Sequence, residues 1–449
     1  MTREALSRHN VVSRVRGRDE HFIVNLLGRT ADLLDPAEAA ALARGEAPGP
    51  EARERGYVVD PGSEAAAEAF AYAQFVSNRA DDEVQLFFAP TYACNFGCTY
   101  CYQVEYTPGP AADDLAVTAA FFAYVDQTFA GRKKYITLFG GEPLLDTPRQ
   151  RAAIGALIDG AAARGLDVAV VTNGYQLTSY LDVLARAHLR EIQITLDGTR
   201  DQHDTRRPLK GGGATFDRVV AGIDATLARG IPVNLRVVVD RDNLGELPAL
   251  ARFARDRGWT SNPLFKTQLG RNYELHVCQA SQERLYSRLE LGQALYELVT
   301  THPEVLELHR PAFSVARHLG ERGELPEPLF DSCPACKTEW AFDTSGRIYP
   351  CTATVGKDGE DVGTFWPRVH LDEARAGAWQ RRDVTTIPEC RDCAVKLACG
   401  GGCGSVAKNK HGRVDTPDCR PVRELLELGL AVYTGDGVGA PKTAASCCG

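Results

Sequence analysis

The chain has 449 residues, of which 44% are hydrophobic and 24% charged, and its formal charge is −8. These values lie near globular averages, so they exclude collagen, coiled coil and global disorder, and the length suits two or three domains. No basic block stands apart, which argues against a nucleic-acid partner. No apolar run reaches the ~20 residues of a membrane span, and the start lacks the apolar core of a secretory signal. We therefore expect a cytoplasmic protein without nucleic-acid or membrane partners.

The first 85 residues carry no cysteine and predict a small α+β module. Residues 21–27 and 56–60 have the β-branched composition of strands, and residues 63–78 have helical character. Asp35 before Pro36 is a typical cap for the Ala-rich helix that follows. We expect this N-terminal module, residues 1–85, to be peptide-recognising or a plain structural extension.

From Val84 to about Arg241 the sequence alternates between short strands and amphipathic helices. The runs EVQLFF, KYITLFG, DVAVVTN, EIQITLDG and PVNLRVVVD are β-branched, and helical stretches separate them. This alternation predicts an α/β fold with a parallel sheet and right-handed crossovers. A full or partial βα barrel fits, with its chemistry at the carboxyl ends of the strands.

Cysteine dominates the C-terminal part of the chain. Eight of the 14 cysteines lie between residues 333 and 419, where aliphatic runs are few. Without a secretory signal, clustered thiols favour metal ligands over disulfides. We expect a core domain at 86–300, a linker at 301–330, a cysteine-rich domain at 331–425 and a tail at 426–449.

The first group of cysteines follows the first barrel strand directly. Cys94, Cys98 and Cys101 have the spacing C-x3-C-x2-C, and three thiolates on one loop can hold three corners of a 4Fe–4S cluster. One iron would then stay free. A structural zinc site needs four ligands, and this loop offers no fourth Cys or His. Zinc and unligated thiols remain the alternatives.

The segment from Cys94 to Cys101, with Tyr100 before the last cysteine, resembles the signature of radical S-adenosylmethionine (radical SAM) enzymes. The resemblance implies a partial (β/α)6 TIM-like barrel. It also implies that the free iron binds the amino and carboxylate groups of S-adenosyl-L-methionine. Reductive cleavage then gives a 5′-deoxyadenosyl radical, which abstracts a substrate hydrogen; the cofactor supplies this chemistry and the protein positions it.

Motifs at the ends of later strands agree with this resemblance. Gly140-Gly141-Glu142-Pro143 follows the second strand, where the resemblance implies a site for the cofactor's amino group; a plain strand-to-helix turn is the alternative. The cofactor-binding residues that the resemblance implies are Tyr100, Gly140, Gly141, Glu142, Asn173 and Thr195. The run Leu196-Asp197-Gly198 with His203-Asp204 and Arg207-Pro208 resembles peptide-modifying members, but Asp197 and His203 are as well explained by capping of a loop. Arg236 could pair with a carboxylate, and a surface ion pair explains it at least as well.

The C-terminal cysteines resemble the SPASM domain, which carries two auxiliary 4Fe–4S clusters. The resemblance implies two ligand sets, Cys333, Cys336, Cys351 and Cys403, and Cys390, Cys393, Cys399 and Cys419. With the first cluster this gives three 4Fe–4S clusters. Two zinc sites would use the same ligands. Cys333 lies close to Cys336 in the sequence. If Cys333 is a ligand, both clusters are fully ligated and suit an electron relay; if it is not, an open iron could bind a substrate thiolate. Cys278, Cys447 and Cys448 lie outside both sets and have no assigned role.

The resemblance implies a radical SAM/SPASM maturase that modifies a residue of a ribosomally made peptide. Its partners would be a precursor peptide or protein and an external electron donor of the flavodoxin or ferredoxin type. The alternative within the same chemistry is an anaerobic sulfatase-maturing type enzyme that forms formylglycine. A non-catalytic iron–sulfur electron carrier and a zinc-bound interaction module are the rivals from other classes. No catalytic base stands out in the sequence.

Overall fold

The computed structural model describes residues 4–47, 49–105, 114–271 and 282–434. Its N-terminal part consists of β1 (Ala5–Leu6), β2 (Asn10–Arg14), β3 (His21–Asn25), β4 (Thr30–Leu34), α1 (Pro36–Ala43), β5 (Val58–Val59) and α2 (Pro61–Asp81). Strands β2, β3 and β4 form an antiparallel sheet, and β1 pairs with β5. Asp35 caps α1 as predicted, because its carboxylate accepts a hydrogen bond from the Glu38 backbone at 2.8 Å.

Six parallel strands form the centre of the molecule. The elements in chain order are β6 (Val84–Ala89), α3 (Asp114–Thr128), β7 (Lys134–Leu138), α4 (Pro148–Ala162), β8 (Val168–Thr172), α5 (Leu177–Leu184), β9 (Leu189–Thr195), α6 (Arg200–Arg206), α7 (Phe216–Ala228), β10 (Val233–Val239), α8 (Leu247–Asp256) and β11 (Phe265–Arg271). The strands pair in the order β6 to β11, each parallel to the next. The expected α/β fold with a partial (β/α)6 barrel is confirmed.

The side chains of β10 show which face of this sheet packs against the helices and which faces the barrel interior. Val233, Leu235 and Val237 are fully buried, and β10 contacts helix α7. Alternate residues of a strand point to opposite faces, so Arg236 points away from the helical layer, toward the barrel interior. The barrel thus has an apolar layer beneath its helices and a more polar interior.

Strand β11 was not predicted from the sequence. Its residues, FKTQLGR, contain only two large apolar side chains and show no β-branched run. The strand pairs with β10 over seven residues, from Val233↔Phe265 to Val239↔Arg271. It forms because backbone pairing to an existing sheet adds to a weak local preference.

The C-terminal part continues the central sheet. It contains α9 (Arg288–Thr301), α10 (Val305–Leu308), α11 (Ala316–Arg322), β12 (Glu339–Asp343), β13 (Arg347–Tyr349), β14 (Gly363–Thr364), β15 (His370–Leu371), α12 (Glu373–Gln380), α13 (Lys396–Cys399), α14 (Gly404–His411) and α15 (Val422–Tyr433). Strand β12 pairs parallel with β6, and β13 to β15 follow antiparallel, so one sheet has ten strands. The cysteine-rich region therefore shares a sheet with the barrel.

The structure also bears on the segments expected to be a linker and a tail. The expected linker, residues 301–330, contains helices α10 and α11, and the expected boundary at residue 425 lies inside α15. Cys278, Cys447 and Cys448 lie outside the described residues, as does the end of the chain from residue 435. The domain boundaries remain predictions.

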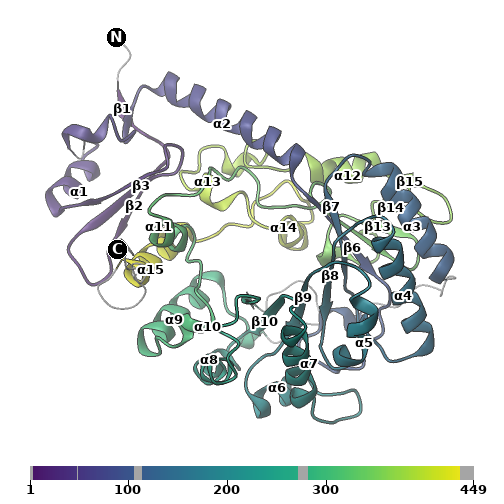
Figure 1. The fold of residues 1–449 in the computed structure, drawn as a ribbon. Coiled ribbons are helices and arrows are strands. Elements are labelled where there is room, and N and C mark those ends of the chain that lie inside the picture. The colour runs from purple at the N-terminus through teal and green to yellow at the C-terminus, as the bar shows by residue number, and fades with distance from the viewer. Residues whose placement is uncertain (1–3, 48, 106–113, 272–281, 435–449) are drawn as a thin grey trace, which may run out of the picture.

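Helix α2 links the N-terminal sheet to the rest of the molecule. Figure 1 shows the helix running from the N-terminal sheet toward the barrel, with α13 and α14 beneath it. Tyr72 donates a hydrogen bond to Asp383 at 2.7 Å, and Arg79 pairs with Asp331 at 2.7 Å. Nearer its start, Glu68 pairs with Lys396 at 2.6 Å. Within the described part of the chain, no helix has the length and hydropathy of a membrane span.

Candidate active site

The loop that carries Cys94, Cys98 and Cys101 begins where β6 ends, at the carboxyl end of the first barrel strand. All three cysteines are partly buried. The loop is held by backbone hydrogen bonds to the segment after α6: Gly97 donates to Pro208 at 2.8 Å, Thr99 to Arg206 at 3.0 Å, and Lys210 to Asn95 at 2.7 Å. The protein itself therefore fixes the shape of the loop on which the three thiols lie.

A second support for this loop is the glycine pair after β7. The Gly141 backbone donates to Thr91 at 2.9 Å, and the Glu142 backbone donates to Ala93 at 2.8 Å. A Cβ on Gly141 would lie 2.2 Å from the Ala93 oxygen, and one on Gly140, where φ is +125°, would lie 2.6 Å from the Thr91 oxygen. Both positions require glycine because no side chain fits between the two backbones.

Glu142 is buried beside the cysteine loop, with 1% of its surface exposed. Its carboxylate accepts hydrogen bonds from the Thr172 hydroxyl at 2.6 Å, the Asn173 backbone at 2.6 Å and the Leu144 backbone at 2.8 Å. Burial raises the pKa of the Glu142 carboxyl, and these hydrogen bonds oppose the rise. A carboxylate has about four acceptor positions, so room for one further donor remains.

Asn173 directly follows β8, and Thr195 ends the neighbouring strand β9. The Asn173 amide donates to the Asn95 side chain at 2.8 Å, and its oxygen accepts from the Tyr175 backbone at 2.9 Å. Asn173 therefore contacts the cysteine loop directly. Thr195 is 7% exposed and pairs in register with Arg236. The structure thus gathers Glu142, Asn173 and Thr195 at one edge of the sheet.

Burial raises the pKa of the Cys94 thiol to about 11. The Phe96 backbone N–H, 3.3 Å from the Cys94 sulfur, opposes this rise, while Glu142, Cys98 and Cys101 add to it. These effects place the three thiols and the Glu142 carboxylate close enough to influence one another.

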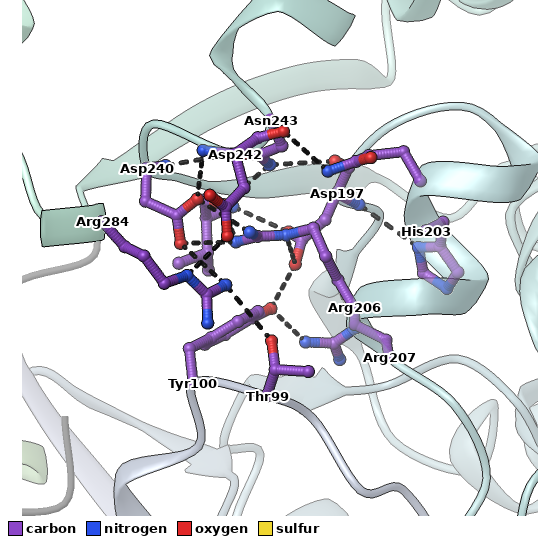
Figure 2. Close-up of polar contacts among 12 residues, drawn as sticks. Thr99, Tyr100, Asp197, His203, Arg206, Arg207, Asp240, Asp242, Asn243 and Arg284 are labelled. Carbon is purple, nitrogen blue, oxygen red and sulfur yellow. Dashed lines mark hydrogen bonds and ion pairs between the residues drawn. The ribbon is translucent and has the colours of Figure 1, made fainter. Parts of the chain in front are cut away.

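Tyr100 belongs to a buried polar network, shown in Figure 2. Its hydroxyl donates to Asp197 and accepts from the Arg207 guanidinium at 2.6 Å. Asp197 is fully buried and also accepts from the Val238 backbone at 2.9 Å. The hydroxyl of Tyr100 is thus engaged within the protein, so only its ring and backbone could face a cofactor.

Arg206 and Asp240 form the centre of the same network. The Arg206 guanidinium donates to both Asp240 oxygens, at 2.8 and 3.1 Å, and lies 5.0 Å from the Tyr100 ring centroid. The Arg206 and Asp240 side chains are 2% and 0% exposed. Arg284 extends the network to Asp240, Asp242 and Thr99 (Figure 2). The ion pair links the ends of α6 and β10 directly beneath the cysteine loop.

His203 supports the network through its ring. Its Nδ1 accepts from the Asp197 backbone at 3.2 Å. Burial, together with Arg207 and Arg206, lowers the pKa of His203 well below its usual value, so the ring is neutral. Asp197 and His203 thus make supporting contacts within this network.

Arg207 places a positive charge close to the first cysteine group. The residue is 7% exposed, and its Nε has no hydrogen-bond partner among the described atoms. Burial raises the pKa of Cys98, and the Arg207 charge opposes that rise. The Arg207 charge also opposes the rise in the pKa of Glu142. A buried cation that acts on both Cys98 and Glu142 suits an anionic group such as a carboxylate.

The C-terminal thiols gather in two groups. Burial raises the pKa of Cys351 well above its usual value, and Glu339, Cys333 and Cys403 add to the rise. Burial also raises the pKa of Cys336, and Cys333 adds to that rise. Burial raises the pKa of Cys390 to about 12, with Cys399, Cys393 and Cys419 adding to the effect. These pKa effects connect members of each predicted ligand set, Cys333, Cys336, Cys351 and Cys403, and Cys390, Cys393, Cys399 and Cys419. Their ligation remains a prediction.

The kinds of ligand present bear on which metal group these thiols can bind. Across the described ranges, no three His, Cys, Asp or Glu side chains are arranged around a point as ligands of a single ion. Sets of three and four thiols without other donors fit 4Fe–4S clusters.

Comparison with known proteins decides the family of the barrel. The profile of the radical SAM superfamily matches residues 88–254. Residues 88–254 form a radical SAM domain. This match contains the cysteine loop, the glycine pair and the end of β9, and the resemblance seen in the sequence is confirmed.

Two relatives show how far sequence similarity extends beyond the radical SAM domain. GTP 3′,8-cyclase of Caulobacter vibrioides is 36% identical over 171 residues, which is 37% of this chain and 46% of the cyclase. Mycofactocin maturase MftC of Mycobacterium ulcerans is 27% identical over 338 residues, 73% of this chain and 85% of the maturase. The chain thus spans under half of the cyclase and most of the maturase.

Solved structures share the fold at low sequence identity. The structure of native anSMEcpe with bound AdoMet and Cp18Cys peptide has a TM-score of 0.58 and 16% identity, covering 79% of this chain and 98% of that one. Streptococcus suis SuiB bound to precursor peptide SuiA has a TM-score of 0.54 and 14% identity, covering 94% of this chain and all of that one. The fold likeness therefore extends well beyond the radical SAM domain.

Sequence reasoning missed the charged residues that support the cysteine loop. Arg206, Asp240 and Arg284 come from three separate segments, and no motif connects them. The one available signal was the pair Arg206-Arg207 shortly after a strand end, because two adjacent arginines on a buried segment require nearby acids.

Proposed function

We propose that the chain is a radical SAM peptide maturase, which abstracts hydrogen from a residue of a ribosomally made peptide. The observation that carries the proposal is the cradle of Cys94, Cys98, Cys101 and Glu142 at the carboxyl end of the barrel strands. Sequence similarity to mycofactocin maturase MftC, over 73% of this chain, supports a peptide as the substrate. The substrate would be a precursor peptide or protein.

S-adenosyl-L-methionine bound at a 4Fe–4S cluster supplies the 5′-deoxyadenosyl radical in such enzymes. In this chain Cys94, Cys98 and Cys101 would hold the cluster. Glu142 has one acceptor position left for an ammonium donor, and Arg207 has a guanidinium edge for a carboxylate. Gly140 and Gly141 keep the backbone close to the loop, and the buried network around Asp197 holds the loop in place.

We further propose three 4Fe–4S clusters, with the eight C-terminal cysteines as ligands of two of them. Full ligation closes both auxiliary clusters and suits a relay for one electron to or from an external donor of the flavodoxin or ferredoxin type. Cys333 supports this reading because it is 5% exposed and lies near Cys403, with its sulfur 3.0 Å from a Cβ placed on Gly404. A cytoplasmic location, where thiols stay reduced, belongs to the same proposal.

The role of Cys333 has its own test. Cys333→Ala should lower the iron content and change the electron paramagnetic resonance of the auxiliary clusters, because loss of a ligand weakens a metal-coupled fold. Release of 5′-deoxyadenosine should survive. Unchanged iron and spectra would show that Cys333 is no ligand and would favour an open iron.

The alternative is a sulfatase-maturing type enzyme that forms formylglycine. The anSMEcpe structure supports it through the fold alone, whereas the sequence match to the maturase covers most of both chains. A non-catalytic electron carrier would have no need for the buried Glu142 and the glycine pair.

The proposal is tested by S-adenosyl-L-methionine cleavage. Reconstituted protein with dithionite should release 5′-deoxyadenosine under anaerobic conditions. The variant Cys94→Ala/Cys98→Ala/Cys101→Ala should release none, while Cys351→Ala should retain release. Equal release by the triple variant would refute the assignment of the first cluster.

A further inference from the structure

A cavity of about 790 Å³ lies beside β11, away from the cofactor cradle. Helix α9, the segment 309–317, α13 and Arg420 contribute the other walls. The cavity touches Thr267, Gln268 and Leu269 in succession. Successive side chains of a strand point to opposite faces, so a cavity that meets all three runs along the edge of the strand.

This edge of β11 carries main-chain groups that the sheet does not use. β11 is the last strand of the ten-stranded sheet. Val233 of β10 donates to Leu264 at 2.8 Å, and the parallel ladder then turns the main-chain groups of Thr267 and Leu269 away from β10. For Leu269 the described residues provide no partner on that side. An open strand edge of this kind can accept an extended peptide.

The charges around the cavity are mostly positive. Its lining includes the four arginines Arg271, Arg288, Arg317 and Arg420, with Glu327 as the one acidic residue. Arg288 pairs with Asp418 and Arg317 with Glu321, while Glu327 pairs with Arg29 outside the cavity. The cavity is therefore cationic in a chain whose formal charge is −8.

Arg420 is the lining cation best placed for an external anion. In the described ranges no acidic side chain lies within ion-pair distance of it, and its Nε has no hydrogen-bond partner. Its nearest polar contact is the Ser332 hydroxyl, at 3.5 Å. Burying a guanidinium without a carboxylate is unfavourable, so an incoming carboxylate would be stabilised there.

The remaining walls are apolar and include a strained turn. Leu291, Leu295 and Leu425 line one side, and Phe313 lines another. Phe313 and Ser314 have φ angles of 42° and 59°, a left-handed conformation that is unfavourable for these residue types. Backbone strain of this kind is concentrated at functional sites.

We propose that this cavity is a docking subsite for the peptide substrate, and that it binds an extended segment in which an apolar side chain lies next to a carboxylate. The segment pairs with the outer edge of β11, its carboxylate lies on Arg420, and its apolar side chain fills the leucine-lined wall. This inference rests on the proposed function. Gln268 lines the cavity, and its side chain accepts a hydrogen bond from Gln193 of β9 at 2.8 Å, so the cavity adjoins side chains of the barrel strands.

The carboxylate can come from an acidic side chain or from a peptide C-terminus, and three probes separate these sources. Ac-Leu-Glu-Leu-NH2, Ac-Leu-Gln-Leu-OH and Ac-Leu-Gln-Leu-NH2 carry a side-chain carboxylate, a terminal carboxylate and none. Each is titrated by calorimetry into the reconstituted full chain under anaerobic conditions. At least one carboxylate peptide should bind about tenfold more tightly than the neutral peptide, a difference of ~1.4 kcal/mol. Equal binding of all three, or no binding, would overturn the proposal.

Two variants locate the binding in this cavity. Arg420→Gln should abolish the preference for a carboxylate. Leu269→Pro removes an outward N–H without removing a ladder hydrogen bond, and should weaken all three peptides. Arg229→Gln removes an exposed arginine that pairs with Asp182, and should leave binding unchanged.

Arg420 follows Cys419 and lies near Cys399 and Cys403, so iron content is measured in the same samples. If Arg420→Gln lowers the iron content but keeps the carboxylate preference, Arg420 acts on the cluster alone and the proposal is wrong. If that variant does not fold, unchanged peptide binding by Leu269→Pro overturns it. Release of 5′-deoxyadenosine without carboxylate-dependent binding would reject the subsite and leave the proposed function intact.

Discussion

The cysteine loop of the barrel and the C-terminal cysteine region hold their thiols in different ways. The three thiols of the loop lie on one segment of eight residues, which backbone hydrogen bonds tie to residues 206–210 and to the glycine pair. The eight C-terminal thiols come from segments up to 86 residues apart, from Cys333 to Cys419. The loop of the barrel is therefore held by backbone hydrogen bonds, whereas the ligation that we propose would tie the distant C-terminal thiols together.

Local structure agrees with this contrast. Strands β6 to β10 have five to seven residues each, while β13, β14 and β15 have three, two and two. Cys336 adopts a left-handed backbone conformation, with φ of 58°, and Gly400, Gly401 and Gly402 do so in succession. Tight backbone of this kind brings distant thiols together, but it contributes little packing of its own.

Loss of an auxiliary ligand should give the largest effect on stability. We expect Cys351→Ala to lower the melting temperature by about 5 °C or more, because metal binding there is coupled to folding. Cys98→Ala, the matched change in the barrel loop, should lower it by less than about 2 °C. Circular dichroism melts of the anaerobically reconstituted proteins make the comparison. Equal losses would remove the distinction between the two regions.

The iron content sharpens the same comparison. Wild type should bind about twelve irons per chain, four for each cluster. The triple variant of Cys94, Cys98 and Cys101 should retain about eight and keep the wild-type melting temperature. Iron near four in wild type, with zinc in the remaining sites, would contradict the assignment of the C-terminal cysteines.

The buried pair of Arg206 and Asp240 should be the strongest polar support of the barrel loop. Arg206→Gln removes the two hydrogen bonds that Arg206 donates to the buried Asp240 and leaves it the more distant Arg284, and it should cost ~3–5 kcal/mol of unfolding free energy. Arg200→Gln breaks an exposed pair with Asp217, whose side chains are 53% and 70% exposed, and should cost ~0–1 kcal/mol. Urea denaturation measures both, and similar costs would show that the network does not support the loop.

The glycine pair tests how closely the barrel shapes its loop. Gly141→Ala places a methyl group 2.2 Å from a backbone oxygen and should cost ~1–3 kcal/mol while lowering 5′-deoxyadenosine release. Gly245→Ala is the matched control, since nothing lies within 4 Å of its Cβ position. Full activity of Gly141→Ala would show that the loop tolerates displacement.

Helix α2 should give the smallest effect. Glu68 pairs with Lys396 and His9, and these partners overcome burial to hold its pKa near 2. Its contribution is therefore fully present above ~4.5 and is lost only as pH falls toward 2. Glu68→Gln should cost ~1–2 kcal/mol equally at pH 8 and pH 6. A cost that shrinks at pH 6 would contradict this ion pairing.

The sequence predicted those parts of the fold in which local pattern and tertiary structure agree. Five barrel strands have β-branched runs, and Asp35 caps its helix by a local rule. The predicted helix at 63–78 extends to Pro61–Asp81 in the structure, because Asp60 caps it and Pro61 suits its first turn. Strand β11 and the pairing of β12 with β6 depend on partners elsewhere in the sheet. Local composition cannot reveal such partners.

The residues of the candidate site also divide into those that local sequence predicts and those that depend on distant partners. Cys94, Gly141 and Glu142 belong to short sequence motifs, so the motifs alone identified them as candidate site residues. Tyr100 illustrates the limit: its place in the motif is evident, but its hydroxyl is taken by Asp197 and Arg207, from a strand end and a helix end far along the chain. Contacts of this kind are set by how the ends of β9 and α6 pack against the cysteine loop, which no motif encodes.

The most direct test of the central claim follows the abstracted hydrogen. Short peptides encoded beside the gene are prepared with deuterated side chains and backbone carbons and incubated with reconstituted protein, dithionite and S-adenosyl-L-methionine. The account predicts 5′-deoxyadenosine that is heavier by one deuterium, and a peptide of altered mass, with wild type but not with the triple cysteine variant. Unlabelled 5′-deoxyadenosine beside an unchanged peptide, for every such peptide, would contradict it.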